Sequence, residues 1–317
     1  MTKAEKSSQA VINRCLEVKK DESVLILVTE PYLEFAQLLQ KASLKKTKYT
    51  YIFFLPDNFN RVGLHPSITH FMQGMDIIIA VTSPSISAME ARIKANQAGT
   101  RIVSLPNMTK STFTRFANTD FKKIYRLSKK LSDILSISKI INVTAPNGTN
   151  LHIPIESHQG YAETGLINKP GTFSHLPAGV ACITPEAGKT EGELVVDSGM
   201  RYDREDPEKL ILSIREGRAA RIKGGVSAKH LRQKLARLGP KNRFVIEFGI
   251  GTNDIARTGG NPMEDEKILG NIYIALGHNS ITDEFLDMDM SLHGVVYKAT
   301  VEVRGKRIID KGRLLLD

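Results

Sequence analysis

The chain has 317 residues, of which 41% are hydrophobic and 25% are charged, a balance typical of a globular protein. Its net charge of +10 is scattered along the chain, without aromatic-interleaved basic stretches or zinc-finger spacing, so we expect no nucleic-acid partner. No stretch approaches the roughly 20 apolar residues of a membrane span, and the start is too polar for a signal peptide, so we expect a cytoplasmic protein without a membrane partner.

The first part of the chain alternates short apolar strands with helical patterns. We expect strands at residues 24–28, 51–55, 76–81 and 101–105, and helices at residues 4–19 (without an evident cap), 33–44, 65–73, 87–97 and 121–135. Wholly apolar strands separated by helices are typical of a parallel sheet covered on both faces. We therefore predict an N-terminal Rossmann-like three-layer α/β domain over residues 1–138. The turn after its first strand lacks the glycines of a dinucleotide site.

From residue 139 onward the pattern changes to short strands separated by turns. Asn147-Gly148 between two apolar runs is the strongest hairpin signal. One basic helix is expected at residues 227–239, with Ser227 as a candidate N-cap, Gly239 as a stop and a solvated basic face. Strands are expected at residues 140–144, 151–155, 179–184, 193–197, 211–214, 245–250, 272–276, 295–303 and 307–316. We predict a mostly β (α+β) C-terminal domain over residues 139–317 that carries the candidate active site.

Two acids of this second part stand out. The strand period places Ile246, Phe248 and Ile250 on one face and Glu247 on the other, beside the gap left by a glycine, so we expect Glu247 to face a cavity. Glu266 is expected in the first turn of a short helix, where the helix dipole alone could explain an acid.

The two cysteines are expected to play no catalytic role. Cys182 lies in an apolar strand and should be a small core residue. Cys15 is too distant in sequence to form a disulfide framework or a zinc-ligand pair with it.

A series of short segments in this half carries a family resemblance. The segments are Asn147–Leu151, Leu176–Gly179 with Ile183–Pro185, Glu193–Asp197, Glu247–Asn253, Asp265–Lys267 with Ala275–Gly277, and Gly294–Val296. In order and spacing they resemble the metal-dependent aminopeptidases of the aminopeptidase T and aminopeptidase S group, to which a ring-cleaving iron enzyme, the dihydroxypyridine dioxygenase, is similar. The resemblance implies two divalent ions (zinc, cobalt or iron), a water activated to attack a peptide carbonyl, and a homodimer.

The resemblance implies ligands at some positions that this chain keeps and at others that it replaces. The two ligand glutamates fall on Glu247 and Glu266, but a family histidine falls on Tyr273 and a His-x-Asp pair falls on Ser291 and His293. A further family acid falls on Val180. Tyrosine ligates only as a phenolate and serine is a poor ligand, so inherited two-metal chemistry and iron-dependent ring cleavage are both disfavoured.

Two main hypotheses stay open. The first is an aminopeptidase-like hydrolase with a remodelled metal site that acts on a peptide-like or small-molecule substrate. The second is a binding or biosynthetic protein that reuses the scaffold without metal; a ring-cleaving dioxygenase is the third. The candidate residues are Glu247, Glu266 and Tyr273 as catalytic, Asn253, His278 and Ser291 as substrate-binding, and Glu247, Glu266 and His293 as metal ligands. His278 and His293 could instead be structural.

Overall fold

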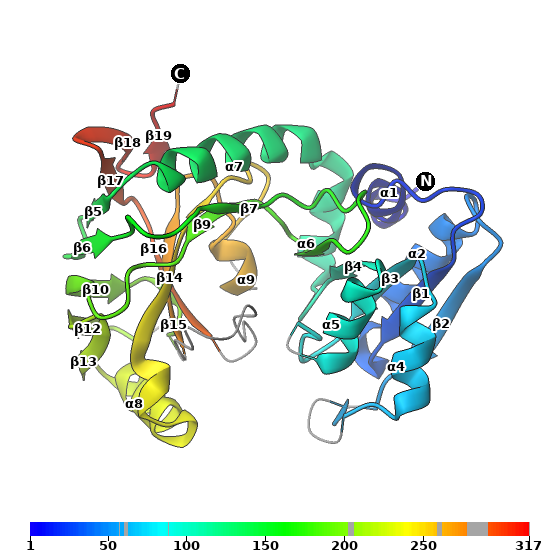
Figure 1. Cartoon of the computed structure of the whole chain (residues 1–317), viewed down its shortest axis with the longest axis horizontal. Coiled ribbons are helices and arrows are strands. Elements are labelled where there is room, and N and C mark those ends of the chain that lie inside the picture. Colours follow the sequence, from blue (N-terminus) through cyan, green and yellow to red (C-terminus); the bar gives the residue numbers. More distant parts are fainter. Residues whose placement is uncertain are drawn as a thin grey trace. The chain divides into compact units, whose positions relative to one another are not determined.

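The computed structural model describes residues 1–56, 58–59, 63–87, 89–201, 206–258, 262–277 and 291–316. The chain divides into two compact units (Figure 1). Unit 1 contains Met1–Tyr125 and Thr164–Ala178, and unit 2 contains Arg126–Glu163 and Gly179–Asp317. The chain thus returns to unit 1 after it has first entered unit 2. The predicted boundary at residues 138/139 separates domains, which are parts of a chain that fold independently. The division into compact units does not test independent folding, so this boundary stays a prediction.

Unit 1 is built on a parallel sheet in the order β2-β1-β3-β4-β8. Its strands are β1 (Val24–Val28), β2 (Thr50–Phe54), β3 (Ile77–Val81), β4 (Arg101–Ser104) and β8 (Phe173–His175). Its α-helices are α1 (Lys3–Ala10), α2 (Leu33–Ser43), α4 (Pro66–Gln73), α5 (Glu90–Gln97) and α6 (Lys110–Arg115), followed by α7 (Phe121–Ser136), which runs into unit 2. Short 3₁₀ or π turns cover Val11–Cys15, Glu30–Tyr32 and Phe116–Asn118.

Both faces of this sheet are packed with apolar side chains. Along β1, Val24, Ile26 and Val28 join one core together with residues of α2. Leu25 and Leu27 join a second core together with residues of α4 and α5. Because alternate residues of a strand point to opposite faces, the sheet is the middle layer of three. The predicted three-layer α/β architecture is confirmed.

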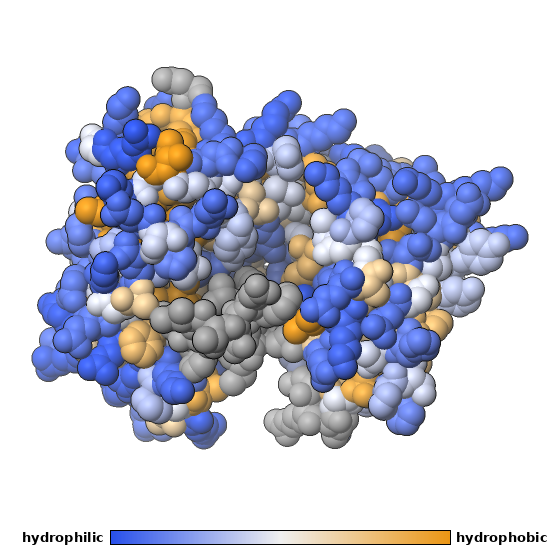
Figure 2. All heavy atoms as spheres, viewed as in Figure 1, coloured by the Kyte–Doolittle hydropathy of each residue, from blue (hydrophilic) through white to orange (hydrophobic). Residues whose placement is uncertain are grey.

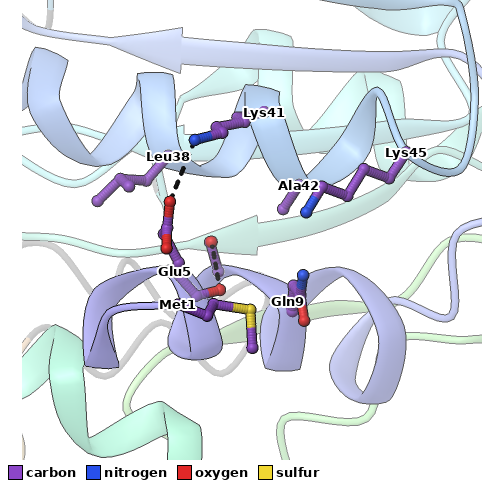
Figure 3. A pocket seen from close by; sticks show the side chains of 8 residues that line it. Met1, Glu5, Gln9, Leu38, Lys41, Ala42 and Lys45 are labelled. Atoms are coloured by element: carbon purple, nitrogen blue, oxygen red, sulfur yellow. Dashed lines mark hydrogen bonds and ion pairs between the residues drawn. The ribbon is translucent and has the colours of Figure 1, made fainter.

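Helix α1 begins at a complete capping box, so the prediction of an uncapped start is wrong. The Thr2 hydroxyl accepts from the Glu5 N–H at 3.1 Å, and the Glu5 carboxylate accepts from the Thr2 N–H at 2.9 Å. Glu5 also pairs with Lys41 of α2 at 3.1 Å, across a shallow hollow that Lys45 and Gln9 help to line (Figure 3). Glu5 therefore both caps α1 and joins it to α2.

Unit 2 is one large antiparallel sheet. Its main path runs β11-β16-β15-β14-β13-β12-β10-β6-β5-β17-β18-β19, and β9 joins β7 to β14. The strands are β5 (Ile140–Thr144), β6 (Asn150–Pro154), β7 (Tyr161–Glu163), β9 (Val180–Ile183), β10 (Glu191–Val196), β11 (Ser198–Gly199), β12 (Leu210–Arg215), β13 (Arg218–Lys223), β14 (Phe244–Gly251), β15 (Ile272–Gly277), β16 (Leu292–Val296), β17 (Thr300–Val303), β18 (Lys306–Asp310) and β19 (Arg313–Leu314). Its described residues also include most of α7, the helices α8 (Val226–Leu238) and α9 (Pro262–Asp265), and the 3₁₀ turn Pro240–Arg243. The predicted mostly β architecture is confirmed.

The turns of unit 2 test the local predictions. The predicted hairpin is confirmed: β5 and β6 pair across Asn147-Gly148, and Gly148 has a φ of +110°. The single strand predicted at residues 295–303 is wrong, because Lys298 adopts a φ of +52° between β16 and β17. The strand predicted at residues 307–316 is likewise divided, at Lys311 with a φ of +46°. β16 and β17 pair with different neighbours, β15 and β5.

Helix α8 confirms one predicted boundary and corrects the other. It ends at Gly239 with a φ of +90°, as predicted. Its N-cap is Gly225 rather than Ser227, whose N–H donates to the Asp206 carboxylate at 3.0 Å within the first turn. Leu231 and Leu235 are buried while the basic residues face solvent, as expected.

Hydrophilic residues dominate the visible surface (Figure 2). Figure 2 shows hydrophilic residues over most of the visible face of each unit, with apolar side chains scattered among them. No helix in the described part of the chain is long and apolar enough to span a membrane.

Candidate functional site

Three candidate residues of unit 2, Glu247, Tyr273 and His293, share one face of neighbouring strands. The antiparallel register of β7, β9, β14, β15 and β16 brings them there, because directly opposed residues project on the same side of a sheet. The opposed residues are Tyr161, Cys182, Gly249 and Tyr273 in one row, and Glu247, Ala275 and His293 in the next.

A β-bulge in β14 changes the predicted alternation. The register shifts between Val245 and Glu247, which leaves Ile246 as the extra residue. Ile246 consequently packs beside Tyr273, whereas Phe248 lies in the main core of unit 2. The prediction that Ile246 shares a face with Phe248 is therefore wrong, since a bulge cannot be recognised from a period of two.

An aromatic ring, rather than open space, occupies the gap beside Glu247. A Cβ atom on Gly249 would lie 2.1 Å from Cε1 of Tyr273, so the absence of a side chain is what lets this ring cross the strand. The Tyr273 hydroxyl donates to Oε1 of Glu247, and the Tyr161 hydroxyl donates to Oε2. Glu247 is only 3% exposed. The expected cavity at this position is thus filled by a hydrogen-bonded tyrosine.

Burial dominates the protonation of this pair. It raises the pKa of Glu247 above its ordinary value, although His293 and the two phenols act in the opposite direction. Burial also raises the pKa of Tyr273 well above its ordinary value, with the neighbouring Cys182 and Glu247 adding to the effect. Tyr273 therefore remains a neutral phenol that donates a hydrogen bond, not a phenolate.

Glu266 follows α9 instead of lying in its first turn, which corrects the prediction. A Cβ on Gly251 would lie 2.1 Å from the Ile268 carbonyl oxygen, so this glycine lets the turn carrying Glu266 lie against the end of β14. Oε1 of Glu266 lies 3.1 Å from Lys267 Nζ, and Oε2 of Glu266 lies 2.5 Å from His293 Nδ1. Burial alone would raise the pKa of Glu266, but Lys267 and His293 bring it down to about 2. Glu266 is an anion at neutral pH.

Lys267 is a buried cation to which we assigned no role from sequence. Its side chain is 4% exposed, and its ammonium bonds to both Glu163 and Glu266. Burial lowers the pKa of Lys267, but the two carboxylates raise it above the ordinary value, so the ammonium stays charged. The sequence signal was a lysine directly after a candidate ligand acid. Glu163 lies in β7, a three-residue strand that the sequence patterns did not predict.

His293 is held between an acid and a hydroxyl. Its Nδ1 lies 2.5 Å from Glu266, and its Nε2 lies 2.8 Å from Oγ of Ser291. Its ring stacks on Tyr273 with 4.9 Å between centroids and 4° between planes. Burial lowers the pKa of His293, yet Glu266 raises it further, so the pKa lies above the ordinary value. The imidazole is therefore a strengthened base in one fixed orientation.

Of the other residues singled out from the sequence, Asn253 and Cys182 lie in the described part of the chain and His278 does not. The side-chain oxygen of Asn253 accepts the N–H groups of Ile255 and Ala256 at 3.0 and 3.2 Å, which shapes its own loop. Cys182 is a buried core residue, as expected, and burial raises the pKa of its thiol. His278 lies outside the described residues. The substrate-binding roles of Asn253, His278 and Ser291 stay predictions.

The donor atoms do not fit a divalent ion as they are arranged. Both oxygens of Glu247 accept from phenols, and both oxygens of Glu266 are engaged by cationic or imidazole nitrogen. Both ring nitrogens of His293 are also engaged. Within the described ranges, no group of three or more His, Cys, Asp or Glu residues is placed to hold a metal. The metal roles of Glu247, Glu266 and His293 stay predictions that this donor set does not favour.

Solved structures share this fold along the whole chain. The 2,5-dihydroxypyridine dioxygenase from Pseudomonas putida matches with a TM-score of 0.82 and 17% identity, covering 100% of this chain and 99% of that one. AmpT from Thermus thermophilus matches with a TM-score of 0.71 and 14% identity, covering 99% of each chain. The resemblance inferred from sequence to both groups is confirmed. A comparison with curated proteins found no match. The model of the 2,5-dihydroxypyridine 5,6-dioxygenase (NicX) family matches residues 14–316, and the chain therefore belongs to this family.

Proposed function

We propose that this chain is a metal-independent member of the family, whose site handles a small molecule by acid–base chemistry at His293. Dioxygenases of the family use iron. The observation that carries the proposal is Lys267, a buried ammonium that already pairs with both Glu163 and Glu266. A second cation at Glu266 would have to displace Lys267 or lie against it, at a large electrostatic cost.

The residues at the inherited ligand positions support the same proposal. The resemblance implies histidine at Tyr273, histidine at Ser291 and an acid at His293. Tyr273 is a buried neutral phenol stacked on His293, so it offers no anionic oxygen to a metal. Oγ of Ser291 lies 2.8 Å from Nε2 of His293, so these two side chains form a hydrogen bond with each other at positions where the resemblance implies metal ligands.

Titration of the chelator-treated full chain with Fe²⁺, Zn²⁺ and Co²⁺ tests the proposal by calorimetry. We expect no stoichiometric binding by the natural chain. A variant carrying Tyr273→His, Ser291→His and His293→Asp restores the implied ligand types and should gain iron affinity. Tyr125→His, on the exposed part of α7, is a matched control that should gain none. One equivalent of ion bound by the natural chain and lost in Glu247→Gln would overturn the proposal.

Iron-dependent ring cleavage is a second candidate, which the family match over residues 14–316 favours. It predicts oxygen uptake when iron-supplemented protein meets 2,5-dihydroxypyridine, whereas the metal-independent account predicts none. An aminopeptidase-type hydrolysis has only the shared fold in its favour and needs metal in the same way. A peptide-like ligand and a homodimer remain predictions, which a peptide-library assay and light scattering would test.

A further inference from the structure

We infer that Ser291, His293 and Glu266 form a nucleophilic triad able to take an acyl group from an uncharged ester. The inference rests on the proposed metal-independent function, because an ion on His293 would take the lone pair that the serine hydroxyl needs. The serine oxygen, the imidazole and the carboxylate follow one another at 2.8 and 2.5 Å. A nucleophile, a base and an acid that orients the base, each within hydrogen-bond reach, form the arrangement that activates a hydroxyl.

The strand explains why the first two members meet. Ser291 immediately precedes β16 and His293 is two residues further along, so both side chains project on the same side of the strand. The two imidazole nitrogens then point in different directions. Nε2 faces the serine hydroxyl, and Nδ1 faces the carboxylate of Glu266. When Nδ1–H donates its hydrogen bond to the Glu266 carboxylate, the Nε2 lone pair is directed at the serine hydroxyl.

Two neighbours hold the triad in place. Tyr273 stacks on the imidazole with 4° between ring planes, which fixes the tilt of the base. Lys267 binds Oε1 of Glu266 at 3.1 Å, which leaves Oε2 for His293. The His293 side chain is 19% exposed and that of Glu266 only 2%, so the acid is the inner end of the triad. Ser291 is half-buried, so the serine is the outer end of the triad.

The reaction balances with water as its only co-reactant. The Ser291 oxygen attacks the ester carbonyl carbon while its proton passes to Nε2 of His293. The bond to the alcohol oxygen then breaks, and the leaving alcohol takes that proton. Water attacks the acyl carbon through the same base, the bond to Ser291 breaks, and its oxygen recovers a proton. The buried carboxylates of Glu163 and Glu266 contribute negative charge beside the triad, which disfavours an anionic acyl donor.

An alkyl fluorophosphonate on chelator-treated full-length protein tests the triad. The serine oxygen forms a bond to phosphorus, fluoride leaves, and the hydroxyl proton passes to His293. Mass spectrometry of the digest should locate one adduct at Ser291. Ser291→Ala should remove it, and His293→Ala should slow its formation by about 100-fold. Ser213→Ala, a half-buried serine of β12 in the same unit, is the matched control and should label fully.

Glu266 is a positioning residue, and its variant separates orientation from folding. Glu266→Gln should lower the maximal inactivation rate while the concentration for half-maximal inactivation stays unchanged. A disrupted site would instead lower the maximal rate and also raise that concentration. Circular dichroism confirms that each variant is folded. No adduct on the folded natural chain, or an adduct that persists in Ser291→Ala, would overturn the triad. If the titration with ions also finds no metal, the metal-independent function survives that failure.

Discussion

The buried ammonium of Lys267 gives the sharpest test of how the site is held together. Methionine at this position keeps much of the side-chain volume and removes the charge. Glu163 and Glu266 would then remain buried without the cation that both contact. Removing one partner from a buried ion pair costs about 3–5 kcal/mol, because the remaining charges stay buried without compensation.

The pKa of Glu266 gives an independent magnitude. Lys267 and His293 overcome the effect of burial and lower this pKa from 4.5 to about 2. At about 1.4 kcal/mol for each pKa unit, the shift corresponds to about 3 kcal/mol of stability, which the two partners share. The lost contact with Glu163 adds to the share of Lys267. We therefore expect Lys267→Met to lower the free energy of unfolding by about 3–5 kcal/mol.

Urea denaturation, followed by circular dichroism, measures this loss. Lys129→Met is the matched control, because the Lys129 ion pair with Asp133 is more than half exposed and should cost less than about 1 kcal/mol. The pH dependence has a definite sign. A carboxyl with a lowered pKa in the folded state stabilises above its unfolded pKa and loses that contribution as pH falls through the folded value. The natural chain should therefore lose stability between pH 4.5 and about 2.

The variant should respond less to acid. With Lys267 absent, Glu266 keeps His293 as a partner among the described residues, so its pKa is lowered less. The difference in stability between variant and natural chain should therefore shrink below pH 4.5. A decrease of less than about 1 kcal/mol in the free energy of unfolding at neutral pH would refute the account, because so small a decrease is typical of an ion pair exposed to water. An unchanged difference at low pH would show that packing, not charge, explains the loss.

Two further substitutions test the position of Tyr273. Tyr273→Phe removes one hydrogen bond from the buried carboxyl of Glu247 and should cost about 1–3 kcal/mol, while Tyr125→Phe on exposed α7 should cost almost nothing in the same urea assay. Gly249→Ala places a Cβ 2.1 Å from the Tyr273 ring and should reduce stability and shift the near-ultraviolet circular dichroism of the tyrosines. Gly74→Ala, whose Cβ would have its nearest neighbour at 3.6 Å, should leave both unchanged. Equal effects in the two glycine variants would contradict the inferred contact.

Local sequence patterns predicted much of the fold. The period-two and helical patterns located most strands and helices to within a few residues, because burial of an apolar face requires them. They failed where one residue changes the backbone. The bulge at Ile246 and the positive φ of Lys298 each redirect a strand without an obvious composition signal. The return of residues 164–178 to unit 1 depends on long-range pairing of β8 with β4.

The sequence allowed us to predict which residues lie together in the candidate site, but not which of them contact one another. The resemblance pointed to Glu247, Glu266, Tyr273 and His293, which the structure brings close together. It assigned no role to Lys267, although that lysine neighbours Glu266 in sequence. A lysine beside an acid is ordinarily a solvated pair, and only tertiary packing shows that this one is buried between two carboxylates.

Metal content tests the central claim most directly. The full chain should be produced in medium supplemented with iron, zinc and cobalt, purified without chelator, and measured by plasma mass spectrometry beside the variant that carries Tyr273→His, Ser291→His and His293→Asp. The metal-independent account predicts far less than one ion per natural chain and a clear gain of iron in the variant. One tightly held ion per natural chain, released in parallel with loss of function, would contradict it.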